Sequence, residues 1–143
     1  MRSQIATAVV SELNGQAAYF VPATFTAVRA HMPLEDLADL KTLHVTVVTR
    51  SFSQELSSRA DIQTEIEVDV AVQHKVAPED NTPMDALNTL VERIIKFFER
   101  RVLSGYEQAI WTKTENALLY IPEHLKKRLF TSVITLTYRL CAE

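Results

Sequence analysis

The sequence predicts an α+β fold: a single, mostly antiparallel sheet of about five strands with two main helices packed on one face. Residues 61–76 alternate between apolar and polar side chains, which is typical of a long strand with one apolar and one acidic face. Apolar residues recur at steps of three and four between Thr82 and Gly105, which indicates an amphipathic helix that covers the apolar face. Links of hairpin length between strands favour antiparallel neighbours. The expected order of elements is α-β-β-β-α-β-β.

The length and charge of the chain bound its class. A chain of 143 residues is long enough for one sizeable core, and we expect residues 1–143 to form a single domain. The net charge of -3 argues against a general nucleic-acid binder. No apolar run is long enough to span a membrane, and Glu12 interrupts the one near the N-terminus, so we expect neither a membrane helix nor a secretory signal. The single cysteine, Cys141, cannot form an internal disulfide.

Common enzyme signatures are absent. Gly15 and Gly105 are the only glycines, whereas a phosphate-binding loop or a dinucleotide fingerprint needs several close together. The sequence also has no CxxC, HExxH or GxSxG motif. We therefore expect no enzyme and no cofactor.

The N-terminal half is expected to open with a short amphipathic helix at residues 3–14, which ends at Gly15. A strand at residues 24–31 and one or two helical turns at residues 33–40 follow. A second strand begins at residue 43, where apolar and polar residues alternate again.

Residues 50–58 are polar and hold neither glycine nor proline, and we interpret them as a projecting hairpin loop before the long strand. Matching the apolar faces of the two strands then sets their register. It places Val45 opposite Thr64 or Ile66, which brings His44 opposite Glu65 or Glu67.

The histidines raise the question of a metal site. Zinc needs several ligands converging on one ion. The expected register separates His44 and His74 by roughly 23–30 Å at the rise of a strand. His31 lies at a strand end and His124 in a connection. We therefore expect no metal site.

The C-terminal half begins with the main helix. Thr82 suits the cap position, Pro83 the first helical position, and Gly105 the end. Its apolar stripe comprises Leu87, Leu90, Val91, Ile94, Phe98 and Val102, widened by Ile95 and Phe97. A strand at residues 109–115, a connection at residues 116–127 and a closing strand at residues 129–140 complete the chain.

Residues 118–139, LLYIPEHLKKRLFTSVITLTYR, resemble the end of small neck proteins of tailed bacteriophages, of the tail-terminator or tail-completion kind. Their Leu-Tyr, Pro-Glu-His-Leu, Phe-Thr-Ser-Val and Thr-Leu-Thr-Tyr-Arg strings carry the resemblance. The stretches VAVQHKV at 70–76 and MDALNTLVERI at 84–94 are similar too. The likeness covers about residues 43–139.

The resemblance implies a virion structural protein of the tail or neck, made in the cytoplasm of a bacterial host. Such proteins form a ring, often of six copies, that caps the tail tube and faces the connector between head and tail. The implied partners are other copies of the chain, the tail-tube protein and head-tail connector proteins. DNA would pass the lumen without specific binding, and no membrane is involved. One alternative is a head-side stopper or adaptor, and another is a small ligand-binding or enzymatic α+β domain with its site on the acidic face.

The candidate assembly surface has three parts, each with a plainer interpretation. The acidic row of the long strand is either a solvated sheet face or, in a ring, the lining of the lumen, along which DNA slides. Its residues are Asp61, Glu65, Glu67 and Asp69. The basic cluster at residues 126–128 is either solvated or contacts the acidic face of a neighbouring copy. The loop at residues 50–58 is either a plain hairpin or a contact to the tube or connector. The surface comprises Arg50, Phe52, Arg59, Asp61, Glu65, Glu67, Asp69, Lys126, Lys127 and Arg128.

Overall fold

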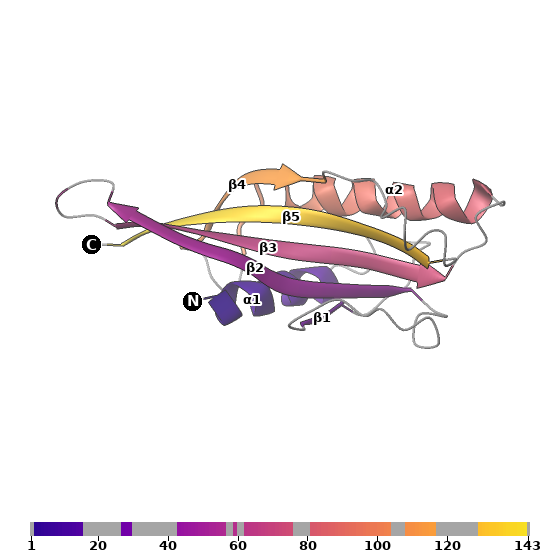
Figure 1. Cartoon of the computed structure of the whole chain (residues 1–143), viewed down its shortest axis with the longest axis horizontal. Coiled ribbons are helices and arrows are strands. Elements are labelled where there is room, and N and C mark those ends of the chain that lie inside the picture. Colours follow the sequence, from indigo (N-terminus) through magenta and orange to yellow (C-terminus); the bar gives the residue numbers. More distant parts are fainter. Residues whose placement is uncertain are drawn as a thin grey trace.

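The computed structural model (Figure 1) describes residues 2–15, 27–29, 43–56, 59, 62–75, 81–103, 108–116 and 129–142. The elements follow the predicted order and confirm the α+β class. They are α1 (Arg2–Gly15), β1 (Ala27–Arg29), β2 (His44–Leu56), β3 (Ile62–Lys75), α2 (Asn81–Phe98), β4 (Ile110–Glu115) and β5 (Leu129–Ala142). No described helix has the length and apolar character needed to cross a membrane.

The sheet has five strands in the order β1-β2-β3-β5-β4. β2 pairs antiparallel with β3, as their hairpin-length link predicts, and β5 pairs antiparallel with both β3 and β4. β3 and β5 are neighbours in the sheet although α2 and β4 separate them in the chain. β1 is the exception, because it pairs parallel with β2. Residues 30–43 separate these two strands, which is long enough for the crossover that a parallel pair requires.

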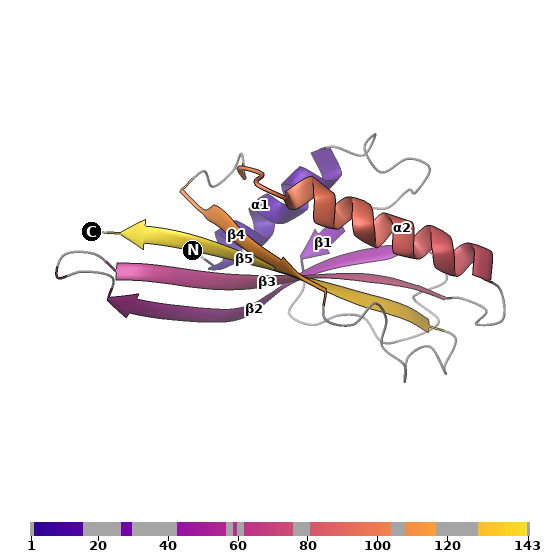
Figure 2. The same ribbon diagram turned by 90° about the horizontal axis from the view of Figure 1, so that it is seen from above.

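Both helices lie on the same side of the sheet (Figure 2), as predicted. The helix-side face of the sheet carries the apolar residues of β3 and β5, which are fully buried against the helices. Burying each large apolar side chain contributes about 2 kcal/mol before the cost in chain entropy. These core residues are Ile66, Val68, Val70, Val72, Phe130, Ile134, Leu136 and Tyr138.

The predicted end of the main helix is wrong. α2 ends at Phe98, and Arg100 adopts a left-handed conformation with φ of 57°. The N–H of Arg101 then donates to the carbonyl of Phe98 at 3.1 Å. This turn directs Leu103 into the core, while Val102, expected on the buried stripe, is 62% exposed.

The predicted loop at residues 50–58 is also wrong for its first seven residues, because β2 continues to Leu56. The polar residues there reflect a strand exposed on both faces. The register moves accordingly: Val45 lies opposite Val72, and His44 opposite Gln73 rather than a glutamate. A bulge between Thr49 and Ser51 absorbs one residue of β2.

The distal ends of three strands extend beyond both helices (Figures 1 and 2). We call this extension the arm, and define it as residues 52–56 of β2, 62–65 of β3 and 139–142 of β5. Phe52 pairs with Ile66 and Leu56 with Ile62, so these side chains lie on the helix-side face of the sheet. The opposite side of the sheet is called the outer face below.

Candidate assembly surface

The outer face carries the predicted acidic row. Glu65, Glu67 and Asp69 alternate with the buried residues of β3, so their side chains point away from the helices. On the neighbouring β5 they face Arg139, Thr137 and Thr135. The fourth acidic residue, Asp61, lies outside the described residues.

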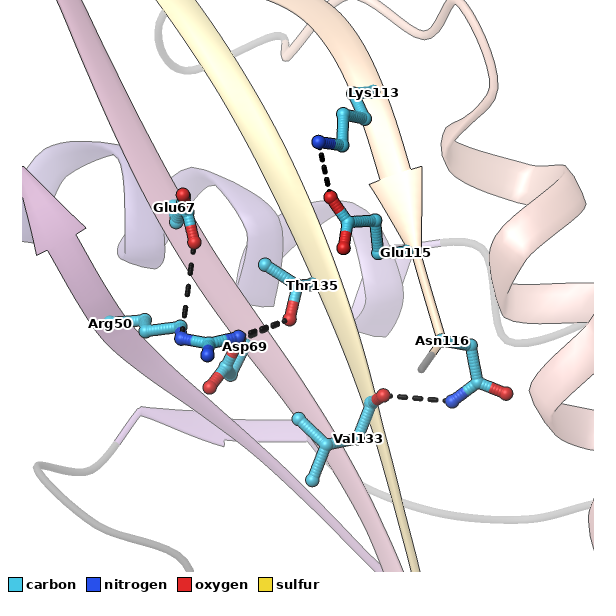
Figure 3. A network of polar contacts seen from close by, with 8 residues as sticks. All are labelled: Arg50, Glu67, Asp69, Lys113, Glu115, Asn116, Val133 and Thr135. Atoms are coloured by element: carbon cyan, nitrogen blue, oxygen red, sulfur yellow. Dashed lines mark hydrogen bonds and ion pairs between the residues drawn. The ribbon is translucent and has the colours of Figure 1, made fainter. Parts of the chain in front are cut away.

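Arg50 reaches from β2 across this row (Figure 3). Its Nη1 donates to Thr135 Oγ1 at 3.2 Å and lies 3.9 Å from Asp69 Oδ1. Its Nε lies 3.9 Å from Glu67 Oε2. Thr135 Oγ1 in turn donates to Asp69 Oδ1 at 2.7 Å. The bulge of β2 places Arg50 here, so this residue, expected on a loop, ties three strands together.

β4 adds a second ion pair to the outer face. Lys113 and Glu115 lie two residues apart on this strand, and their side chains form an ion pair (Figure 3). The hydrogen bond with Glu115 raises the pKa of Lys113, and the charges of Glu67 and Glu65 raise it further. The same hydrogen bond lowers the pKa of Glu115, assisted by the charge of Arg50. Both side chains are exposed, so the pair contributes little to stability.

The outer face is therefore mixed in sign rather than uniformly acidic. Arg50 neutralises part of the row from β2, and Lys113 acts on it from β4. Sequence reasoning missed the β4 pair, although the alternation of Lys113 and Glu115 at a spacing of two indicates one face of a strand. Only the sheet order shows that β4 and β2 contribute to the same surface.

The helix-side face of the arm carries three exposed apolar side chains around the hydrogen-bonded polar pair of Gln54 and Thr64. Phe52 is 38% exposed, Leu56 69% and Ile62 43%. Neither helix extends over this part of the sheet (Figure 2). Large apolar side chains exposed on one face at the end of a sheet are suited to a protein-protein contact. Phe52 was predicted in the assembly surface, whereas Leu56 and Ile62 were not.

The remaining predicted residues are placed as follows. Arg59 is exposed near the tip of the arm, between the ends of β2 and β3. The basic cluster Lys126, Lys127 and Arg128 lies outside the described residues.

The histidine separation expected from the sequence is wrong. His44 lies opposite Gln73, the residue that precedes His74 in β3, so the two histidines are near one another in the sheet rather than far apart. The described residues nevertheless contain no group of three or more histidine, cysteine, aspartate or glutamate side chains that could hold a metal ion. His31 and His124 lie outside those residues.

Comparison with known proteins finds similarity in structure but not in sequence. No protein-family profile matches the chain, and no curated protein matches it in sequence. The fold resembles the sheath/tube terminator, in its extended state, of an extracellular contractile injection system, PVC, solved by cryo-EM. The two chains share 11% sequence identity with a TM-score of 0.49, and the match covers 99% of this chain and 56% of that chain. The chain thus spans about half the length of that terminator.

Proposed function

We propose that the protein is a structural component of a phage-like tail end that associates with copies of itself into a ring, closes the tail tube and joins it to the head. The observation that carries this proposal is the arm, where three apolar side chains are exposed on one face of paired strands. The resemblance of residues 43–139 to tail-terminator neck proteins supports the choice of partners. The work of such a protein is geometric, and we propose no catalytic activity.

The arm by itself supplies limited binding energy. Fully burying a large apolar side chain contributes about 1.5–3 kcal/mol, and roughly half of each arm residue is already covered, so Phe52, Leu56 and Ile62 together contribute about 3 kcal/mol. Association of two proteins costs about 4–15 kcal/mol in lost freedom. The arm must therefore act together with further contacts. We expect a free protein that associates weakly in solution and assembles on the end of a tail tube.

The test compares arm variants with a matched control. Leu56→Ser and Phe52→Ser remove apolar surface from the arm, whereas Val102→Ser removes a similarly exposed residue beyond the end of α2. We expect the wild type and Val102→Ser to bind the ends of tail-tube fragments and stop their lengthening, measured by electron microscopy and light scattering. Both arm variants should lose this activity while keeping their thermal stability.

Two outcomes would overturn the proposal. Arm variants that cap tubes as well as the wild type would show that the arm is not the contact. A wild-type protein that ignores tail tubes but binds isolated connectors would assign the chain to the head side instead.

A further inference from the structure

The sheet has two open edges within the described part of the chain. β4 forms one edge, because it pairs only with β5. At the other edge β1 covers β2 only at Val45–Val47, so the stretch of β2 from Val48 to Leu56 has β3 as its one described neighbour. Open edges offer backbone N–H and C=O groups to a further strand.

The two open edges lie at the same level along the strand direction of the sheet. The residue pairs across β5 and β3 place Lys113 of β4 in the same row of the sheet as Ser51 of β2. In the same way, Trp111 lies in one row with Phe52, and Ile110 lies in one row with Ser53. A neighbouring copy turned about an axis parallel to the strands therefore presents its β4 level with this part of β2.

The strand directions also match. β2 is antiparallel to β3, β3 to β5 and β5 to β4, so β2 and β4 run in opposite directions. β4 of a rotated copy would thus meet β2 as an antiparallel partner. Both helices would remain on the same side of the joined sheet (Figure 2). Two different complementary edges at one height are what a head-to-tail ring requires.

We propose that β4 of one copy pairs with residues 48–53 of β2 in the next copy, so that one continuous sheet runs around the ring. This inference rests on the proposed function and specifies its self-contact. On the helix-side face the pairing brings Trp111, which is half-buried, opposite the exposed ring of Phe52. On the outer face it brings Glu115 level with Val48 of the next copy.

Side-chain hydrogen bonds attach the edge strand β4 to β5, and a charged residue on β4 limits pairing with other strands. Thr112 Oγ1 donates to the carbonyl of Thr137 at 3.2 Å. Asn116 Nδ2 donates to the carbonyl of Val133 at 2.8 Å (Figure 3). These bonds hold the middle of β4 and the residue that follows it on β5. Lys113 protects the edge against indiscriminate pairing, since a charged side chain disfavours an apolar partner strand. In the proposed contact Lys113 meets the hydroxyl of Ser51 instead.

Disulfide trapping tests this contact. In a Cys141→Ser background we make Ser51→Cys and Lys113→Cys as separate proteins, mix them in equal amounts and oxidise them. Within one chain these residues are three strand spacings apart, roughly 14 Å, which is too far for a disulfide. We expect a crosslinked dimer from the mixture and none from either variant alone. The pair Ser53→Cys and Ile110→Cys should behave alike, and Lys113→Cys mixed with Val102→Cys should give no product.

The outcomes separate this inference from the proposed function. Rings detected by light scattering without crosslinking of either pair would overturn the edge contact and leave the ring intact. Crosslinking of Ser51→Cys with itself, but not with Lys113→Cys, would also overturn it, because it would indicate a two-fold contact between β2 edges. A protein that stays monomeric at every concentration, alone and with tail-tube fragments, would overturn the proposed function and this contact together.

Discussion

Replacement of Tyr138 by phenylalanine is expected to stabilise the protein. Tyr138 is fully buried on β5, and among the described residues its hydroxyl has no hydrogen-bond partner. A buried polar group without a partner costs about 1–3 kcal/mol relative to its hydrated state in the unfolded chain. Tyr138→Phe removes that cost and leaves the ring in place. We expect a gain of about 1 kcal/mol, or about 3 °C in melting temperature for a domain of this size.

The same substitution changes the response to alkaline pH. Burial raises the pKa of Tyr138 above its ordinary value of 10.0, and the negative charge of Glu12 raises it further. A group whose folded pKa is raised contributes stability that is complete below its unfolded pKa and is lost as the pH rises beyond it. Because the unfolded tyrosine ionises first, the wild type should lose about 1.4 kcal/mol at pH 11 through this residue. Tyr138→Phe should not show that loss.

Urea unfolding of both proteins at pH 7 and at pH 11 measures the two effects, with Tyr138→Leu as a control for ring packing. The difference in unfolding free energy between Tyr138→Phe and the wild type should grow with pH. A variant that is less stable than the wild type at pH 7 by 1 kcal/mol or more would refute the reasoning, since it would mean that the hydroxyl has a hydrogen-bond partner.

Three further predictions concern the end of α2 and the β4 ion pair. Arg101→Ala should lower the unfolding free energy by about 2 kcal/mol, because the buried Glu12 carboxylate loses the 2.8 Å bond from Arg101 Nε; urea unfolding measures this, and a loss below about 0.5 kcal/mol would contradict it. Arg100→Gly should stabilise by about 0.5–1 kcal/mol, since glycine adopts φ of 57° without strain, and an unchanged melting temperature would argue against this. Lys113→Met should return the lowered pKa of Glu115 towards 4.5 in an NMR titration; Glu115 then loses its share of stability, which is present above pH 4.5 and disappears as the pH falls. An unshifted Glu115 titration would mean that the Lys113 pair is absent in solution.

The long strand and the main helix were predictable because their patterns are local. β3 spans Ile62–Lys75, close to the predicted residues 61–76, since a two-residue alternation fixes both the strand and its buried face. The start of α2 was predicted to within two residues, because the helix begins at Asn81 whereas Thr82 was expected at the cap position. Its end was not predictable, because competition between Val102 and Leu103 for the core depends on the neighbouring elements.

The candidate surface was predictable only in part. The parity of β3 places Glu65 and Glu67 on the outer face, as expected. The extension of β2 through Phe52 was missed, because polar residues exposed on both faces of a strand have the composition of a loop. That error shifted the register and with it the partner of His44.

The sequence by itself determined the helix-side face, since the alternation along β3 and β5 and the stripe on α2 require nothing beyond neighbouring residues. It did not predict that Ala71, Gln73 and Thr131 on the outer face are buried as well. Only the tertiary structure decided the order of the strands and which residues lie opposite one another on neighbouring strands. The strand order β1-β2-β3-β5-β4 brings Arg50 to Asp69 and Thr135, and sets the open edges of β2 and β4 level with one another. Such relations arise from pairing between residues far apart in the chain. Many registers satisfy the same alternating pattern, so only the packed sheet selects one.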